Sequence, residues 1–218
     1  AVTLPAPLFA ADKASASPNE KLTAAIIGCG IRGKAHAKEL ARIADCDVAW
    51  VCDPDLDRAD EVGALLVELK RPMPKKAQDV RKVLEDKAVD VVFIATPNHW
   101  HALAAIWAMQ AGKDVYVEKP VSQNVEEGRR IVQAARKLGR IAQTGTQNRS
   151  RGALAEAVKF MREGKLGEVK LAKSIIYQGR GSIGGPAECV MPPRCDYNLW
   201  AGPAPMTKLT RPKFHYDW

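Results

Sequence analysis

A short glycine pattern near the N-terminus constrains this chain more than any other feature. The apolar run from Ala24 to Ile27 leads into Gly28-Cys29-Gly30-Ile31-Arg32-Gly33, and an apolar helical pattern follows at once. Glycines at this spacing allow a tight turn after a strand and let a ligand approach the backbone closely. The following helix would point its N-terminal amides at a pyrophosphate. Asp53 closes the next apolar run, 20 residues after Gly33, where a dinucleotide fold carries its ribose-binding carboxylate.

The order of apolar and helical segments predicts an α/β fold. Six strands are expected, at Leu22 to Cys29, Asp47 to Cys52, Pro74 to Ala77, Val89 to Ala95, Asp114 to Val117 and Ile141 to Thr144. Amphipathic helical patterns separate most of them, with a capping box at Asn124 and Glu127 and a C-terminal glycine at Gly139. Strands that alternate with helices indicate a doubly wound parallel sheet of the Rossmann type.

The pattern changes after Gly145, so we expect a second domain. A helix carries Leu154, Ala157, Val158 and Met161, a longer strand is expected from Glu168 to Tyr177, and residues 179–205 are rich in Gly and Pro. The expected parts are a signal-peptide remnant and linker at 1–20, an NAD-binding Rossmann domain at 21–148 and the beginning of a second domain at 149–218. About 70 residues are thin for an independent core, and the chain stops on a run of aromatic residues, so we expect a fragment.

Composition narrows the classes of partner. The chain has 218 residues and a net charge of +8, but its basic residues are scattered and no aromatic-rich basic block accompanies them, which argues against a nucleic-acid partner. No stretch approaches the ~20 apolar residues of a membrane span. The first 11 residues are apolar and the next nine are small and polar, which predicts an exported, periplasmic protein. A disordered tail on a cytoplasmic protein is the alternative.

Polar segments follow several of the expected strands. In an open parallel sheet the carboxyl ends of the strands share one edge, so these segments should converge on one crevice. The candidate cofactor-binding residues are Gly28, Gly30, Ile31, Arg32, Gly33, Asp53, Arg58, Thr96, Pro97, Asn98, His101, Glu118, Lys119, Gln147 and Asn148. Asp53 would accept from both ribose hydroxyls and repel a 2′-phosphate, which favours NAD; Arg58, one helical turn further, keeps NADP possible. Asp53 as a helix cap is the structural alternative.

Lys119 is the sharpest candidate for a catalytic residue. A lysine beside the nicotinamide could exchange a proton with a substrate hydroxyl. The alternative is a surface lysine paired with Glu118. We also hypothesise that the peptide bond before Pro120 is cis.

The remaining candidates carry weaker expectations. His99 and His101 lie two residues apart at a helix start, where their side chains diverge, and no carboxylate or thiol completes a site, so no metal is expected. One of these histidines lining the cofactor pocket is the preferred interpretation. Cys189 and Cys195 lie in a loop-rich stretch, where two separate thiols are expected and a disulfide between them is the alternative. Arg180, Arg194 and Tyr197 are possible substrate contacts.

Four motifs together resemble the Gfo/Idh/MocA oxidoreductases, the glucose–fructose oxidoreductase and inositol dehydrogenase group. They are the glycine turn at Gly28 to Gly33, Ala95-Thr96-Pro97-Asn98-His99-Trp100-His101, Glu118-Lys119-Pro120 and Gly145-Thr146-Gln147-Asn148-Arg149. The resemblance covers residues 21 to about 180. The Glu-Lys-Pro tripeptide after the Asn-His-x-His loop is its most diagnostic part.

The resemblance implies a Rossmann domain followed by an α+β substrate domain with a mostly antiparallel sheet that joins subunits into dimers or tetramers. It implies NAD(P)-dependent transfer of a hydride at a sugar or cyclitol carbon, with Lys119 as the matching catalytic lysine. The chain departs from the family pattern because it ends before the further catalytic Asp and His. An NAD-dependent, redox-neutral glycosidase of the same fold is one alternative. A non-catalytic NAD-binding protein or inactive fragment is the other.

Overall fold

A six-stranded parallel sheet forms the centre of the protein. The computed structural model describes residues 21–175, 177, 179, 181, 182, 184–210 and 213–215. The strands lie in the order β3-β2-β1-β4-β5-β6. They are β1 (Leu22–Ile27), β2 (Cys46–Cys52), β3 (Lys75–Ala77), β4 (Val91–Ile94), β5 (Asp114–Glu118) and β6 (Ala142–Gly145). All six expected strands are confirmed. The order reverses between β1 and β4, and such a switch point leaves a crevice at the carboxyl edge of the sheet.

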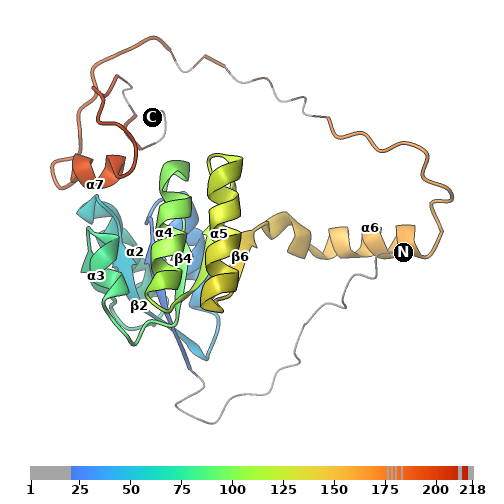
Figure 1. The fold of residues 1–218 in the computed structure, drawn as a ribbon, viewed down its shortest axis with the longest axis horizontal. Coiled ribbons are helices and arrows are strands. Elements are labelled where there is room, and N and C mark those ends of the chain that lie inside the picture. Colours follow the sequence, from blue (N-terminus) through green and yellow to red (C-terminus); the bar gives the residue numbers. More distant parts are fainter. Residues whose placement is uncertain are drawn as a thin grey trace.

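Helices cover both faces of this sheet, and Figure 1 shows α4 and α5 side by side over one of them. That face also receives α3, and the opposite face receives α1 and α2. Successive side chains of a strand point to opposite faces, so Ala24 and Ile26 pack with α1 and α2, whereas Ala25 and Ile27 pack with α4. The helices are α1 (Ile31–Leu40), α2 (Leu56–Glu68), α3 (Val80–Leu84), α4 (Asn98–Gln110) and α5 (Val125–Leu138).

The helix ends follow their sequence signals. The side chain of Asn124 accepts a hydrogen bond from the backbone N–H of Glu127, and the Glu127 carboxylate accepts from the N–H of Gln123. Gly139 ends α5 in the left-handed conformation, with φ at 61°. The Asp55 carboxylate caps α2 by accepting from the N–H of Asp57. These local devices fix where each helix begins relative to the edge of the sheet.

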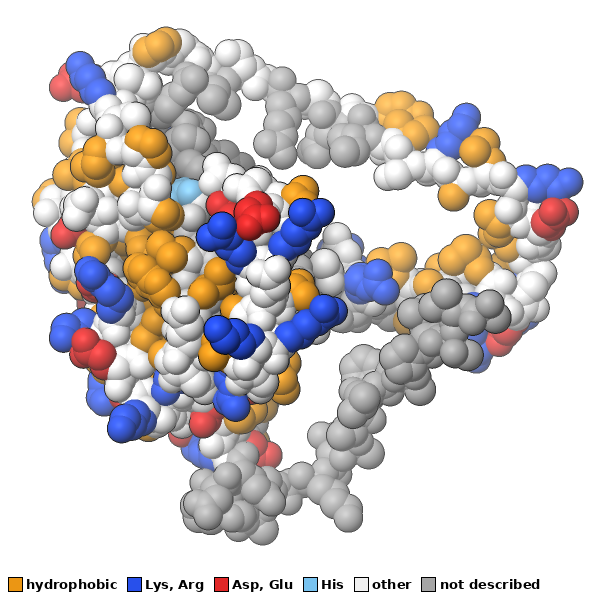
Figure 2. Space-filling model, in the orientation of Figure 1, with side chains coloured by type: hydrophobic (Ala, Val, Ile, Leu, Met, Phe, Trp, Pro, Cys, Tyr) orange, Lys and Arg blue, Asp and Glu red, His pale blue; other side chains and the backbone are white. Residues whose placement is uncertain are grey.

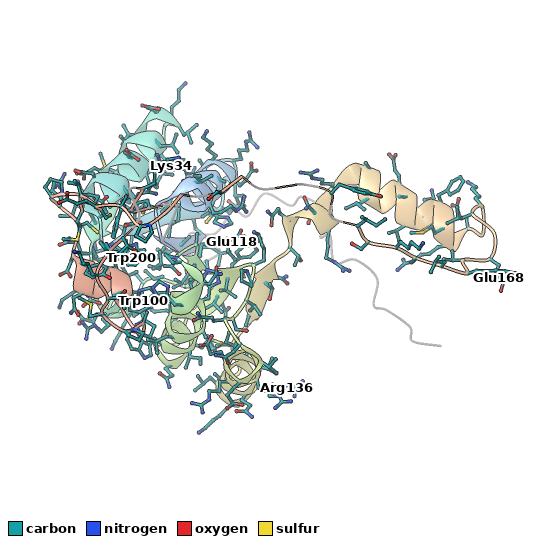
Figure 3. All side chains as sticks on the ribbon, turned by 90° about the horizontal axis from the view of Figure 1, so that it is seen from above. Lys34, Trp100, Glu118, Arg136, Glu168 and Trp200 are labelled. Carbon is teal, nitrogen blue, oxygen red and sulfur yellow. The ribbon has the colours of Figure 1, made fainter. Side chains whose placement is uncertain are left out.

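The chain leaves the sheet after β6. A short 3₁₀ helix, η2 (Gln147–Ser150), leads into α6 (Gly152–Arg162), which extends away from the sheet in Figures 1 and 3. No side chain of α6 is buried against the described residues. The expected strand over Glu168 to Tyr177 is wrong, because the described residues there are exposed and form no strand. A strand needs a neighbour that accepts its backbone hydrogen bonds, and none lies beside this segment in the described part of the chain.

The chain then returns to the sheet. Residues 189–210 and 213–215 include a short helix, α7 (Tyr197–Ala201), where a loop was expected, and Figure 1 shows it beside α2 and α3 at the edge of the sheet. An apolar cluster of Cys195, Trp200, Ala201 and Phe214 supports this segment. Cys189 and Cys195 are both free thiols. The expected signal remnant at 1–20 and Arg180 lie outside the described residues. No helix in the described ranges is long and apolar enough to cross a membrane.

Candidate functional site

A crevice of about 470 Å³ opens at the carboxyl edge of the sheet, within the range of about 300–1,000 Å³ for small-molecule sites. Most of the predicted site residues line it: Gly28, Gly30, Ile31, Arg32, Asp53, Arg58, Thr96, Pro97, Asn98, His101, Glu118 and Lys119. Three do not. Gln147 and Asn148 are exposed on η2, and Gly33 lies in α1 and does not line the crevice. The convergence of separate strand ends on one crevice is therefore confirmed, but the residues after β6 lie outside it.

At each glycine of the turn, an added Cβ would approach a different neighbouring group too closely. Gly28 has a φ of 90°, and a Cβ there would lie 2.6 Å from the carbonyl of Ala95. A Cβ on Gly33 would overlap the carbonyl oxygen of Gly28, so this glycine lets α1 pack closely against the turn. A Cβ on Gly30 would lie 2.9 Å from the guanidinium of Arg58. The turn thus exposes its backbone and the N-terminus of α1 to the crevice, with Arg58 over Gly30.

Asp53 is held at the end of β2 by backbone amides. Its two carboxylate oxygens accept hydrogen bonds from the N–H of Cys29 at 2.7 Å and of Asp55 at 2.9 Å. Burial raises the pKa of Asp53, and these two hydrogen bonds oppose that rise. Asp53 therefore links the glycine turn to the start of α2. Asp55 rather than Asp53 caps the helix, so the capping alternative for Asp53 is wrong.

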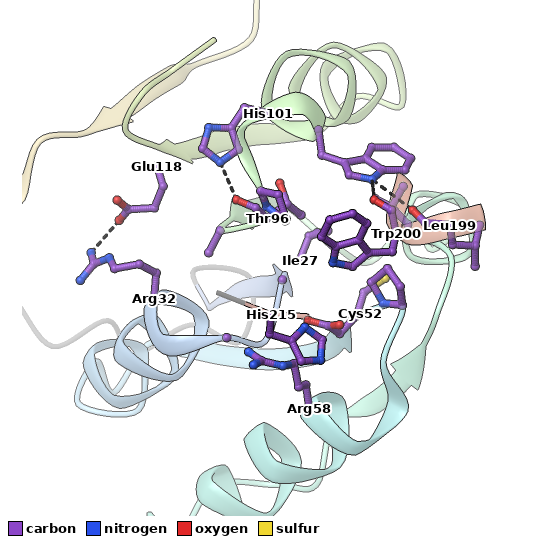
Figure 4. A pocket seen from close by; sticks show the side chains of 18 of the residues that line it. Ile27, Arg32, Cys52, Arg58, Thr96, His101, Glu118, Leu199, Trp200 and His215 are labelled. Carbon is purple, nitrogen blue, oxygen red and sulfur yellow. Dashed lines mark hydrogen bonds and ion pairs between the residues drawn. The ribbon is translucent and has the colours of Figure 1, made fainter. Parts of the chain in front are cut away.

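Glu118 is a buried carboxylate at the other end of the crevice, and it pairs with Arg32 and His36. Its carboxylate lies 2.6 Å from Arg32 Nη2 and 3.0 Å from His36 Nε2, and Figure 4 shows the pair with Arg32. Burial alone would raise the pKa of Glu118, but Arg32 and His36 hold it below its usual value. Burial, with the charge of Arg32, lowers the pKa of His36, and Glu118 opposes this shift.

Lys119 follows Glu118 directly and is exposed at the mouth of the crevice. Its carboxylate neighbour is already paired with Arg32, and the Lys119 ammonium has no ion-pair partner among the described residues. The alternative of a Lys119–Glu118 pair is therefore not what this structure contains. The peptide bond between Lys119 and Pro120 is cis, as hypothesised.

The two histidines of α4 have different surroundings. The ring nitrogens of His101 lie 2.6 Å from the carbonyl oxygen of Pro120 and 2.9 Å from that of Thr96, so this side chain joins the two loops that flank the crevice. His99 faces α7, with Nε2 3.0 Å from the carbonyl oxygen of Trp200. Of the two histidines of α4, His101 lines the crevice and His99 does not. Across the described ranges no group of three or more potential ligands could hold a metal ion.

Several lining residues were not predicted from the sequence. Leu199, Trp200 and His215 come from the returning segment, and Figure 4 shows His215 beside Arg58 and Trp200 between Thr96 and Leu199. Gln78 and Asp79 come from the turn after β3, and Val80 is the first residue of α3. The aromatic residues near the end of the chain were the one available signal, since such side chains normally bury. Neither Arg194 nor Tyr197 lines the crevice: Arg194 pairs with Asp57 and Asp60, and Tyr197 donates to the carbonyl oxygen of Thr207.

Acidification is expected to destabilise the protein from about pH 6.5 downward. The pKa values of His36 and Glu118 are both lower in the folded state than their ordinary values, so the unfolded chain binds more protons as the pH falls. His36→Gln should reduce the loss of stability between about pH 7.5 and about pH 5.5, measured by thermal unfolding. It should not abolish it, because burial also lowers the pKa of His99. An identical loss in the variant and the unmodified protein would contradict this account.

The crevice fits a dinucleotide. Its glycine turn has room for a pyrophosphate against the backbone, and no side chain of the described residues caps the N-terminus of α1. The Asp53 carboxylate stands where the adenosine ribose is expected. Two lining atoms, Thr96 Oγ1 and Glu118 Oε2, are buried without a hydrogen-bond partner in the described structure, so a ligand could satisfy them.

On the face shown in Figure 2, Lys and Arg are interspersed with Asp and Glu rather than gathered into one patch.

The parallel sheet, the glycine turn and the carboxylate after β2 define a dinucleotide-binding α/β protein of the Rossmann type. Residues 22–146 match the family described as "Oxidoreductase family, NAD-binding Rossmann fold" (GFO_IDH_MocA). The chain belongs to this family, and its cofactor is NAD. The resemblance drawn from the four sequence motifs is therefore confirmed.

Relatives of known name span two activities. The scyllo-inositol 2-dehydrogenase (NAD(+)) of Bacillus subtilis (strain 168) is 32% identical over 76% of this chain and 46% of its own length. The alpha-N-acetylgalactosaminidase of Shewanella oneidensis is 32% identical over 53% of this chain and 26% of its own. A crystal structure of myo-inositol 2-dehydrogenase from Lactobacillus plantarum superposes with a TM-score of 0.62 at 26% identity, covering 68% of this chain and 43% of that one. The chain thus spans less than half the length of these relatives.

Asp53→Asn is expected to shift the cofactor preference from NAD toward NADP. Removing the charge removes the repulsion of a 2′-phosphate, and Arg58 stands near enough to attract it. We expect the Kd for NAD to rise about tenfold and the ratio of the two Kd values to shift further, measured by calorimetry. The matched control is Glu68→Gln, which removes an exposed carboxylate at the far end of α2. An unchanged NAD-to-NADP ratio in a folded Asp53→Asn variant would exclude this role.

Proposed function

We propose that this chain is the cofactor-binding part of an oxidoreductase that moves a hydride between NAD and the carbinol carbon of a sugar or cyclitol. The observation that carries the proposal is the position of Lys119. This residue lines the same crevice as the glycine turn and Asp53, but lies at the opposite end of it. The inositol dehydrogenases among the relatives support the substrate class.

In this proposal the chain's own residues divide the work. The glycine turn and Asp53 bind and orient the dinucleotide, whose nicotinamide supplies the hydride acceptor or donor when bound. Arg32 and His36 hold the Glu118 carboxylate, and through it the turn that carries Lys119. Lys119 takes the proton of the substrate hydroxyl during oxidation and returns it during reduction. His101 fixes the distance between this turn and the Thr96 loop.

A redox-neutral, NAD-dependent glycosidase is the second candidate. The alpha-N-acetylgalactosaminidase from Shewanella oneidensis, which is 32% identical over 53% of this chain, favours it. Such an enzyme would use the same lysine for proton transfer but would leave no net reduced cofactor. Export to the periplasm and assembly into a homo-oligomer remain predictions from the sequence and its family resemblance.

One assay separates the two candidates. The native protein that carries this chain is incubated with NAD and a panel of inositols and simple sugars, and in parallel with an aryl N-acetylgalactosaminide. Accumulation of reduced nicotinamide with a panel member supports the oxidoreductase. Release of free sugar from the aryl glycoside without accumulation of reduced nicotinamide would overturn it in favour of the glycosidase.

A further inference from the structure

The segment that returns to the sheet is anchored on both sides of the crevice. We call residues 189–210 and 213–215 the wall segment. On one side its backbone pairs with the turn between β2 and α2: the N–H of Leu56 donates to the carbonyl of Arg194, and the N–H of Asp196 donates to the carbonyl of Pro54. The side chain of Arg194 adds ion pairs to α2. The wall segment is therefore fixed next to the residues that follow Asp53.

On the other side the wall segment docks on the N-terminal turn of α4. The indole N–H of Trp100 lies 3.1 Å from the carbonyl oxygens of both Leu199 and Trp200. A Cβ on Gly202 would overlap the Trp100 ring, so the two elements are in close contact. Figure 3 shows Trp100 and Trp200 as neighbours at the same end of the sheet. The wall segment thus spans the crevice from the β2–α2 turn to α4.

Two side chains of the wall segment face the crevice from a rigid aromatic cluster. The ring centroids of Trp200 and Phe214 are 4.8 Å apart, as are those of Phe214 and His215. His215 Nε2 lies 2.8 Å from a carboxylate oxygen of Asp55, and the backbone N–H of Asp55 donates to Asp53. His215 therefore contacts Asp55, and Asp55 in turn contacts the carboxylate that is expected to bind the ribose.

The order of groups along NAD places this wall at its adenosine half. The glycine turn takes the pyrophosphate and Asp53 the ribose, so the base lies beyond Asp53, toward the turn after β3. Gln78 of that turn donates to the carbonyl oxygen of Arg194 in the wall segment, and Trp200 of the wall segment lines the same crevice as Gln78. A flat aromatic side chain suits a purine, because the two surfaces stack and exclude water. The family match ends at residue 146, so the matched domain alone does not include Trp200 or His215.

We propose that the wall segment completes the adenosine subsite of the NAD crevice, with Trp200 contacting the adenine and His215 positioning the Asp53 turn through Asp55. The inference rests on NAD binding in this crevice and not on which substrate is oxidised. A failure of the wall would therefore leave the proposed sugar or cyclitol chemistry intact. Conversely, if the protein binds ADP-ribose through this wall but oxidises no sugar or cyclitol, the inference about the wall holds and the proposed function is wrong.

Calorimetry with ADP-ribose, which lacks the nicotinamide, tests the role of Trp200. Trp200→Ala is expected to raise the Kd for ADP-ribose and for NAD by a similar factor of about ten. The matched control is Val190→Ala in the same segment, where the side chain is exposed away from the crevice, and its Kd values should equal those of the unmodified chain. An unchanged Kd for ADP-ribose in a Trp200→Ala variant with native thermal stability would overturn the proposal.

The His215 variants separate positioning from folding. His215→Leu should raise the Kd for ADP-ribose about fivefold, whereas His215→Gln, which can still donate to Asp55, should restore most of the affinity. Equal affinities in both variants would contradict the positioning role.

Hydrogen exchange on the unmodified chain keeps the proposal testable if Trp200→Ala does not fold. Adding ADP-ribose should slow exchange of the amides of α7 as well as those of the Asp53 turn. Protection of the Asp53 turn with no change in α7 would overturn the proposal.

Discussion

Replacing Lys119 with methionine is expected to lower kcat for sugar or cyclitol oxidation by about 100- to 10,000-fold, the usual contribution of a general acid–base group. Methionine keeps the length of the side chain but cannot carry a proton. The glycine turn and Asp53 lie at the other end of the crevice, so the Kd for NAD should change by less than about threefold. The measurement combines steady-state turnover of the native protein with calorimetry of NAD binding.

The control for Lys119→Met is Lys137→Met, which removes an exposed lysine from the last turn of α5. It should leave both kcat and the Kd for NAD unchanged. Full turnover in Lys119→Met would show that another group handles the substrate proton. A large loss of NAD affinity with normal kcat would instead assign Lys119 to cofactor binding.

Gly28→Ala is expected to cost about 3 kcal/mol or more of folding stability and to raise the Kd for NAD at least tenfold. The positive φ alone costs an alanine about 1–2 kcal/mol. A Cβ 2.6 Å from the carbonyl of Ala95 adds an overlap with the backbone at the end of β4, and relieving it must move the turn or the Thr96 loop. Urea unfolding gives the first quantity, and calorimetry below the unfolding temperature gives the second.

Gly112→Ala provides a matched control, because Gly112 has a similar φ of 80° but no atom within 4 Å of the added Cβ. This variant should lose only the conformational part, about 1–2 kcal/mol, and should bind NAD normally. Equal losses of stability in the two variants would show that the close contact between the glycine turn and β4 has no energetic consequence.

The parallel sheet and the glycine end of the site could be predicted because their determinants are local in sequence. The strands are short apolar runs that end in polar turns, and Asp53 lies at a fixed spacing from Gly33. The ends of a helix could also be predicted: Asn124 and Gly139 mark the two ends of α5 in sequence and in structure.

The wall over the crevice could not be predicted, because its contacts join residues far apart in the chain. His215 lies 160 residues from Asp55, and the Trp100 indole contacts Leu199 across 99. No sequence periodicity and no sequence motif predicts contacts between residues so far apart. The strand expected from Glu168 to Tyr177 failed for the opposite reason: its apolar side chains suggest a strand, but a strand forms only where a neighbour completes its hydrogen bonds.

Isotope transfer tests the central claim most directly. The native protein is supplied with NAD and a cyclitol or sugar that carries deuterium on its carbinol carbons, and the released cofactor is analysed by mass spectrometry. The account predicts that reduced nicotinamide accumulates with one deuterium for each substrate molecule oxidised, and that Lys119→Met loses this transfer while still binding NAD. Turnover of the substrate without deuterium in the released cofactor would contradict it.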